Sequence, residues 1–104
     1  MTEQKQQAIY YVVSCILKYH SLEEAKNKAD DMIATHVARS KQLHEQGTLL
    51  MSGAFLNKKD EPLSTMGILT SREAAEEYVE GDPFYVNDMM SSWSIREWAN
   101  MFAE

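Results

Sequence analysis

The chain has 104 residues, of which 44% are hydrophobic and 25% charged, and its formal net charge is −6. This composition predicts one globular domain over residues 1–104, and the acidic charge argues against a protein that binds nucleic acid phosphates. Residues 1–7 are polar, lack the apolar core of a signal peptide, and are expected to form a flexible lead. No segment approaches the ~20 apolar residues of a membrane span, so we expect a cytoplasmic protein with no membrane partner.

Four segments have the composition of β-strands. Residues 8–18 are rich in β-branched and aromatic side chains and predict the first strand. Residues 48–56 and 63–70 predict two more, which form a hairpin around the polar connection at 57–62. Residues 91–98 predict the last. Cys15, the single cysteine, lies in the first strand, so an internal disulfide is excluded and we expect a small core residue rather than a nucleophile.

A long helix is predicted between the first two strands. Ser21 and Glu24 have the spacing of a capping box, and Gly47 suits the stop after a helix that ends near residue 44 or 46. At helical spacing, one apolar stripe runs along this helix, and we expect it to be buried. His36 lies at the centre of the stripe, Arg39 lies at its edge, and its other members are Ala29, Met32, Ile33, Ser40 and Leu43.

A second, shorter helix is predicted over residues 71–80. Thr70 and Glu73 again have capping-box spacing, and Gly81 is expected to end the helix. At helical spacing, Ala74, Ala75, Tyr78 and Val79 are expected to face inward. Residues 81–88 (GDPFYVND) then predict a tight loop or a single turn before the last strand.

This β-α-β-β-α-β order predicts an α+β, ferredoxin-like fold, with both helices on one face of an antiparallel sheet. The other face is expected to carry the remaining apolar residues of the first strand together with Trp93 or Ile95. Because an exposed face of that size would be adhesive, we expect a second copy to cover it in a homodimer.

His36 needs a hydrogen-bond partner, because burying an unpaired imidazole costs about 1–3 kcal/mol. Asp82, just beyond the second helix, is the candidate. An aspartate bonded to one ring nitrogen fixes the tautomer and leaves the other nitrogen free as an acid or base. Two alternatives stay open: a lone histidine on an apolar face is more often a core residue, and Asp82 followed by Pro83 is by itself a good helix start.

Four segments carry a resemblance to a known family: IYYVVSCIL, HVARSKQLHEQGTLLMSGAF, REAAEEYVEGDPF and WSIREW, which together span residues 10–98. With them the chain resembles the YciI-like (YCII-related) family. The resemblance implies a dimeric α+β barrel of two ferredoxin-like protomers. It also implies a His–Asp pair proposed as catalytic, here His36 and Asp82, in a pocket between the helices and the sheet. One branch of the family removes chloride from a chlorinated hydroxyquinol. The chain departs from the family at Gly53-Ala54, where many members have Gly-Pro, so no relative's substrate can be transferred to it.

Three interpretations of function follow. In the first, the protein is a cofactor-free, metal-free enzyme for isomerisation, lactone chemistry or halide loss on a small ring compound. His36 is then the acid or base, Asp82 orients it, and the substrate-binding candidates are Arg39, Ser52, Phe84, Tyr85, Ser92 and Trp98. In the second, the same pocket holds a metabolite without turnover, as in a binding or stress-related protein. In the third, the protein is an accessory domain whose methionines make adaptable contacts. Ordinary packing remains the alternative for the aromatic residues.

Overall fold

The computed structural model describes residues 8–56 and 60–102, so the expected flexible lead at 1–7 lies outside the described residues. The elements follow in the order β1 (Ala8–Leu17), α1 (Leu22–Lys28), α2 (Asp30–Glu45), β2 (Leu49–Ala54), β3 (Ser64–Leu69), α3 (Arg72–Glu80), α4 (Pro83–Val86) and β4 (Met90–Asn100).

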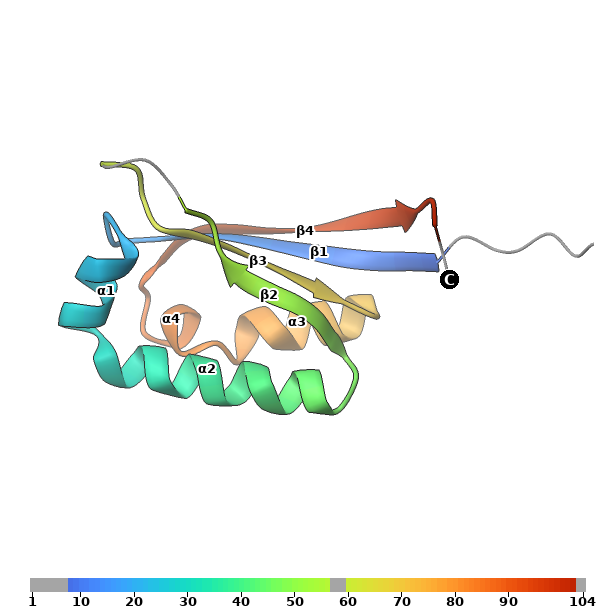
Figure 1. Ribbon diagram of the computed structural model, residues 1–104, viewed down its shortest axis with the longest axis horizontal. Coiled ribbons are helices and arrows are strands. Elements are labelled where there is room, and N and C mark those ends of the chain that lie inside the picture. The colour runs from blue at the N-terminus through green and yellow to red at the C-terminus, as the bar shows by residue number, and fades with distance from the viewer. Residues whose placement is uncertain (1–7, 57–59, 103–104) are drawn as a thin grey trace, which may run out of the picture.

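The strands form one antiparallel sheet in the order β2-β3-β1-β4. The helices lie on one side of it, and β1 and β4 extend past them (Figure 1). This arrangement confirms the predicted ferredoxin-like α+β fold and the β2–β3 hairpin. No helix within residues 8–56 and 60–102 is long and apolar enough to cross a membrane.

The core lies between the sheet and the helices. Alternate residues of β1 (Val13, Cys15 and Leu17) are at most 5% exposed, and α3 packs over β1, β3 and β4. The prediction for Trp93 and Ile95 is wrong: they pair with Cys15 and Val13, so they share the helix-covered face. By the same register, the open face carries Tyr10, Val12, Ile16, Met51, Met66, Ile68 and Trp98.

The long helix that the sequence predicts is divided in two. Ala29, with φ −139° and ψ 43°, leaves the helical conformation and separates α1 from α2. The charges on both sides of the break interact favourably with the helix dipoles, because basic side chains end α1 and Asp30 and Asp31 begin α2. The chain turns at the break, and α1 lies at an angle to α2 at one end of the sheet (Figure 1). The N-cap at Ser21 and the stop at Gly47, whose φ is +84°, are confirmed.

The start of α3 is shifted by one residue from the prediction. Ser71, rather than Thr70, is the N-cap, and its Oγ accepts from the Ala74 N–H at 3.0 Å. Thr70 is held elsewhere, because its backbone N–H donates to the Thr48 carbonyl beside β2. The interior side of α3 agrees with the prediction, with Tyr78 and neighbouring small residues buried.

Candidate functional site

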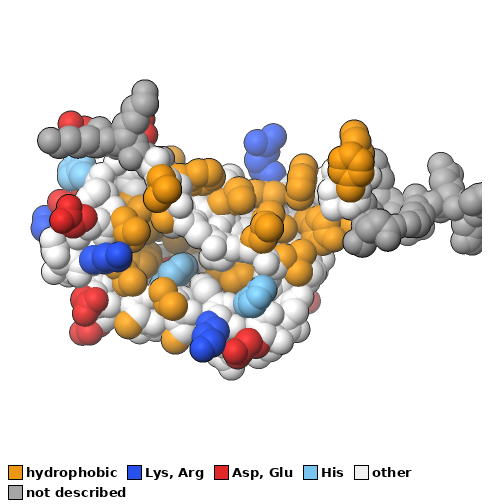
Figure 2. Space-filling view, in the orientation of Figure 1, with side chains coloured by type: hydrophobic (Ala, Val, Ile, Leu, Met, Phe, Trp, Pro, Cys, Tyr) orange, Lys and Arg blue, Asp and Glu red, His pale blue; other side chains and the backbone are white. Residues whose placement is uncertain are grey.

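A cavity of about 700 Å³ lies between α2 and β2. Hydrophobic side chains gather around it, with histidine side chains at its opening (Figure 2). The stripe of α2 faces this cavity: Ile33, His36 and Ser40 line it, and no residue of α2 is fully buried. The stripe is therefore only partly buried: Ala29 belongs to the core and Met32, Ile33 and Leu43 pack against it. The titratable ring of His36 lies on a cavity wall rather than inside the core.

His36 and Asp82 are in contact. The ring Nδ1 lies 2.8 Å from Asp82 Oδ2, and the side chains are 22% and 6% exposed respectively. The second carboxyl oxygen, Oδ1, accepts the Phe84 N–H at 2.8 Å. Asp82 therefore caps α4, with Pro83 as its first helical residue, and binds His36 at the same time. The two sequence interpretations of Asp82 describe the same carboxylate.

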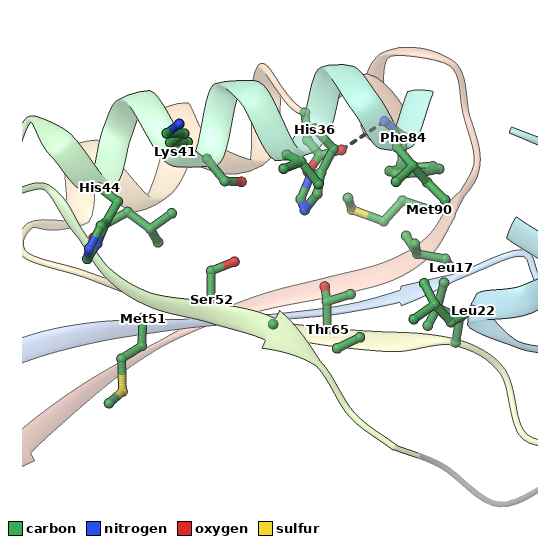
Figure 3. Close-up of a pocket in the computed structure, with 18 of the residues that line it drawn as sticks. Leu17, Leu22, His36, Lys41, His44, Met51, Ser52, Thr65, Phe84 and Met90 are labelled. Atoms are coloured by element: carbon green, nitrogen blue, oxygen red, sulfur yellow. Dashed lines mark hydrogen bonds and ion pairs between the residues drawn. The ribbon is translucent and has the colours of Figure 1, made fainter. Parts of the chain in front are cut away.

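These contacts determine what His36 can offer to a ligand. An ionised carboxylate only accepts hydrogen bonds, so Nδ1 carries the ring proton and donates a hydrogen bond to Asp82. In the neutral ring, Nε2 is then the unprotonated nitrogen. The ring projects from α2 into the cavity toward the sheet (Figure 3), so this nitrogen is the one that a bound molecule meets. The Phe84 ring lies edge-on to the imidazole, with centroids 6.0 Å apart, and limits its rotation.

Tyr78 is a site residue that the sequence analysis assigned only to the core. Its phenol is 3% exposed, and its Oη lies 3.1 Å from Ser52 Oγ on the cavity wall. Burial raises the pKa of the Tyr78 phenol, and the hydrogen bond with Ser52 partly offsets that rise. The helical spacing of Tyr78 indicated an inward direction, but nothing in the sequence indicated that its hydroxyl reaches β2.

A bulge in β2 places Ser52 on the cavity side. Leu49 pairs with Leu69 but Met51 pairs with Ile68, so the strand has one extra residue between them. The bulge reverses the alternation, so that Leu49 is buried under the helices and Ser52 faces α2 too. Ser52 and Met51 point to opposite sides of the strand (Figure 3).

Of the six predicted substrate-binding residues, the cavity is lined by Ser52 and Phe84. Arg39 turns away: its guanidinium donates to the carbonyls of Tyr78 at 2.9 Å and Glu77 at 2.6 Å, at the C-terminus of α3. It lies so close to Gly81 that a Cβ there would collide with it. Arg39 therefore stabilises a helix end, and the glycine that ends α3 provides room for it.

The other three predicted binding residues also lie outside the cavity lining. The Tyr85 ring packs edge-on against Trp93 at 6.4 Å, while Trp98 packs beside Tyr10 on the open face of the sheet. Ser92 is exposed on β4, opposite Ile16.

Two basic side chains that the sequence analysis did not assign to the site border the cavity. They are Lys41 and His44, and His44 Nδ1 lies 2.7 Å from the Leu49 carbonyl. Asp82, the acidic residue of the lining, is already paired. Within residues 8–56 and 60–102, no group of three or more His, Cys, Asp or Glu side chains lies together as metal ligands would.

A sequence model of the YCII-related domain matches residues 10–99. No curated protein sequence matches the chain. Similar solved structures include a 5-chloro-2-hydroxyhydroquinone dehydrochlorinase (TftG) from Burkholderia phenoliruptrix, in complex with 2,5-dihydroxybenzoquinone. The two sequences are 14% identical, the match covers 86% of this chain and 92% of that chain, and the TM-score is 0.60. NE2512 from Nitrosomonas europaea, a protein of unknown function, has 12% identity, coverage of 94% and 93%, and a TM-score of 0.54. Rv0793 from Mycobacterium tuberculosis has 11% identity, coverage of 89% and 94%, and a TM-score of 0.51. At these identities the likeness shows the fold, which is one that small-molecule enzymes use.

Proposed function

We propose that this chain, which belongs to the YCII-related family, is a small cofactor-independent enzyme that transfers protons on a small ring compound. The observation that carries the proposal is the geometry of His36. One ring nitrogen is bound to the buried carboxylate of Asp82, while the ring itself lines a cavity large enough for a small molecule.

In this proposal His36 is the acid or base and Asp82 orients it. Nε2 takes a proton from a carbon or oxygen of the substrate, and the imidazolium that forms is stabilised by the adjacent carboxylate. Because the Phe84 N–H holds the other oxygen, the carboxylate keeps its position throughout. The same ring then returns the proton at another atom, which gives an isomerisation, or it assists the departure of a halide.

The cavity wall favours a flat, mostly apolar substrate. Most of its lining side chains are aliphatic or aromatic, and hydroxyl groups of Ser40, Ser52 and Thr65 are the neutral polar exceptions. The dehydrochlorinase with the same fold binds a quinone, so oxygenated rings are the first compounds to test. Arg39 has no part in this proposal, because its guanidinium is engaged at α3.

The second candidate is a protein that binds such a compound without turning it over. It is favoured by the role of Asp82 as the N-cap of α4, which accounts for a buried carboxylate without any catalysis. Proton exchange on a bound molecule distinguishes the two functions.

We also propose that the protein is a homodimer whose open sheet faces pack together. That face presents Val12 and Ile68 on its central strands, flanked by Met51 and Trp98 on the edge strands. Monomeric proteins seldom expose contiguous apolar surfaces of this extent. A cytoplasmic location remains part of the proposal, since Cys15 is a free, buried thiol rather than half of a disulfide.

The proposed function is tested by titrating the protein with 2,5-dihydroxybenzoquinone while its NMR signals are recorded. We expect the signals of cavity residues, His36 among them, to shift on binding. Replacing His36 with glutamine should abolish turnover in a screen of ring compounds, whereas His20→Gln, at an exposed position outside the cavity lining, should have no effect. If neither the quinone nor any other ring compound perturbs the cavity signals, the proposed function is wrong.

A further inference from the structure

Three hydroxyl groups from three different elements meet at the cavity. Ser40 comes from α2, Ser52 from β2 and Tyr78 from α3, and the phenol hydrogen-bonds Ser52 at 3.1 Å. Ser40 and Ser52 line the cavity, but Tyr78 is buried behind them. The Ser52 side chain points from β2 toward α2 (Figure 3).

The sheet provides room for this arrangement. Gly67 on β3 pairs with Ser52, and a Cβ at position 67 would lie 3.0–3.2 Å from three atoms of the Tyr78 side chain. Such contacts are tighter than ordinary packing, so the phenol crosses β3 at the position where no side chain stands. Gly53 on β2 has no such role, because a Cβ there would meet nothing within 4 Å.

The hydrogen bond between Ser52 and Tyr78 leaves one of their donors unused. The two hydroxyls carry two protons, and the bond between them uses one. With Tyr78 donating, the unused proton belongs to Ser52 on the cavity wall. Donation from the phenol also strengthens Ser52 as a donor.

We propose that Ser52, held in place by Tyr78, forms with Ser40 a subsite that binds a keto or enol oxygen of the ligand. This inference rests on the proposed function and specifies its substrate class as ring compounds with an acidic C–H beside a carbonyl. Ser40 follows His36 by four residues, so it lies on the same side of α2 about 6 Å further along the axis. One small ring can therefore meet both the imidazole and the subsite.

The chemistry balances without a further reactant. His36 Nε2 takes the proton from the carbon beside the carbonyl, and the C–H electron pair forms a carbon–carbon double bond. The carbonyl π electrons move to the oxygen, which becomes an enolate oxygen and accepts the serine hydrogen bond. Returning the proton to the same or a conjugated carbon restores the ketone. Tyr78 is a positioning residue in this scheme, because it acts through Ser52.

The test compares binding of 1-indanone, a flat ketone, with binding of indane, which lacks only the oxygen. Affinities come from NMR titration, and the infrared carbonyl stretch of bound 1-indanone reports hydrogen bonding directly. We expect the wild type to prefer the ketone by about five- to tenfold, the value of one hydrogen bond. Ser52→Ala and Tyr78→Phe should each reduce this preference and raise the stretching frequency. Tyr11→Phe, which removes a phenol hydroxyl that contacts Glu97 outside the cavity lining, should leave both unchanged.

The outcomes separate this inference from the proposed function. If 1-indanone and indane bind the wild type equally, or if Tyr78→Phe weakens both compounds by the same factor, the subsite is wrong while the proposed function stands. If neither compound binds, the subsite is also wrong, while the proposed function is decided separately by titration with 2,5-dihydroxybenzoquinone and the other ring compounds. Gly67→Ala provides a second variant, because it displaces the phenol without removing any hydroxyl and should reproduce the Tyr78→Phe result.

Discussion

Replacing Asp82 with asparagine or with alanine should have very different consequences. Alanine removes both hydrogen bonds of the carboxylate. Loss of an N-cap side chain costs about 0.5–2 kcal/mol, and the unpaired Nδ1–H of His36 adds roughly 1 kcal/mol, at the low end because the ring is partly exposed. We therefore expect Asp82→Ala to lower the free energy of unfolding by about 2–3 kcal/mol, or roughly 10–20 °C in Tm for a domain of this size.

Asparagine keeps one oxygen and should lose ~1 kcal/mol or less. The Phe84 N–H can only donate, so the amide oxygen is expected to stay there and the amide nitrogen to face His36. Because that nitrogen also only donates, Nδ1 must become the acceptor, and the ring proton moves to Nε2. The Asp82→Asn protein should thus be folded but present an N–H to the cavity in place of a base.

Urea denaturation measures the stabilities, and ¹⁵N NMR of the neutral imidazole identifies the tautomer. Asp88→Asn is the matched control, because the Asp88 side chain is 93% exposed and its ion pair with Lys18 is a surface contact worth little. The reasoning is refuted if Asp82→Asn is as unstable as Asp82→Ala, or if its neutral ring keeps the proton on Nδ1.

Three further predictions concern other parts of the chain. Burial raises the pKa of the Cys15 thiol from 9.0 to about 11, so the folded state keeps this proton to higher pH than the unfolded state. This difference contributes ~2–3 kcal/mol to the free energy of unfolding below pH 9, and the contribution should be lost between pH 9 and 11. Urea titrations of Cys15→Ala should lack this pH-dependent loss, and if they show it the assignment to Cys15 is wrong. Arg39→Met should lower the free energy of unfolding, measured in urea, by about 1–2 kcal/mol because two partly exposed hydrogen bonds to α3 are lost. The affinity for 1-indanone should not change, and weaker ligand binding at unchanged stability would contradict the structural role of Arg39. Ile68→Asp should convert the proposed dimer to a monomer in light scattering, and an unchanged mass would exclude the open face as the interface.

The sequence predicted the arrangement of the elements because that arrangement follows from local patterns. β-branched runs, the Ser21 cap and the Gly47 stop each depend on a few neighbouring residues, and their order indicates the ferredoxin-like fold. The break at Ala29 was missed because alanine is a strong helix former. What divides α1 from α2 is the packing of α1 at the end of the sheet together with dipole-matched charges on both sides of the break.

The contact between His36 and Asp82 was predicted from a stripe position and a neighbouring loop, whereas a pocket beside it was expected only from the family resemblance. Helical periodicity shows which side of α2 faces inward and does not show how far α2 lies from β2. Nor does alternation reveal the bulge that turns Ser52 inward, or the room above Gly67 that lets Tyr78 reach it. Arg39 was placed near the site because it is one turn from His36, yet its long side chain reaches α3 instead.

The central claim is that His36 exchanges a proton with a molecule bound in the cavity, and hydrogen–deuterium exchange measures this directly. The protein is incubated with 1-indanone in D₂O, and loss of the proton signal beside the carbonyl is followed by NMR. We predict exchange at least tenfold faster than in buffer for the wild type, since acid–base catalysis contributes ~10²–10⁴, and the buffer rate for His36→Gln. If bound 1-indanone exchanges at the buffer rate in the wild type, His36 does not act as a base, and the protein is the non-catalytic binder.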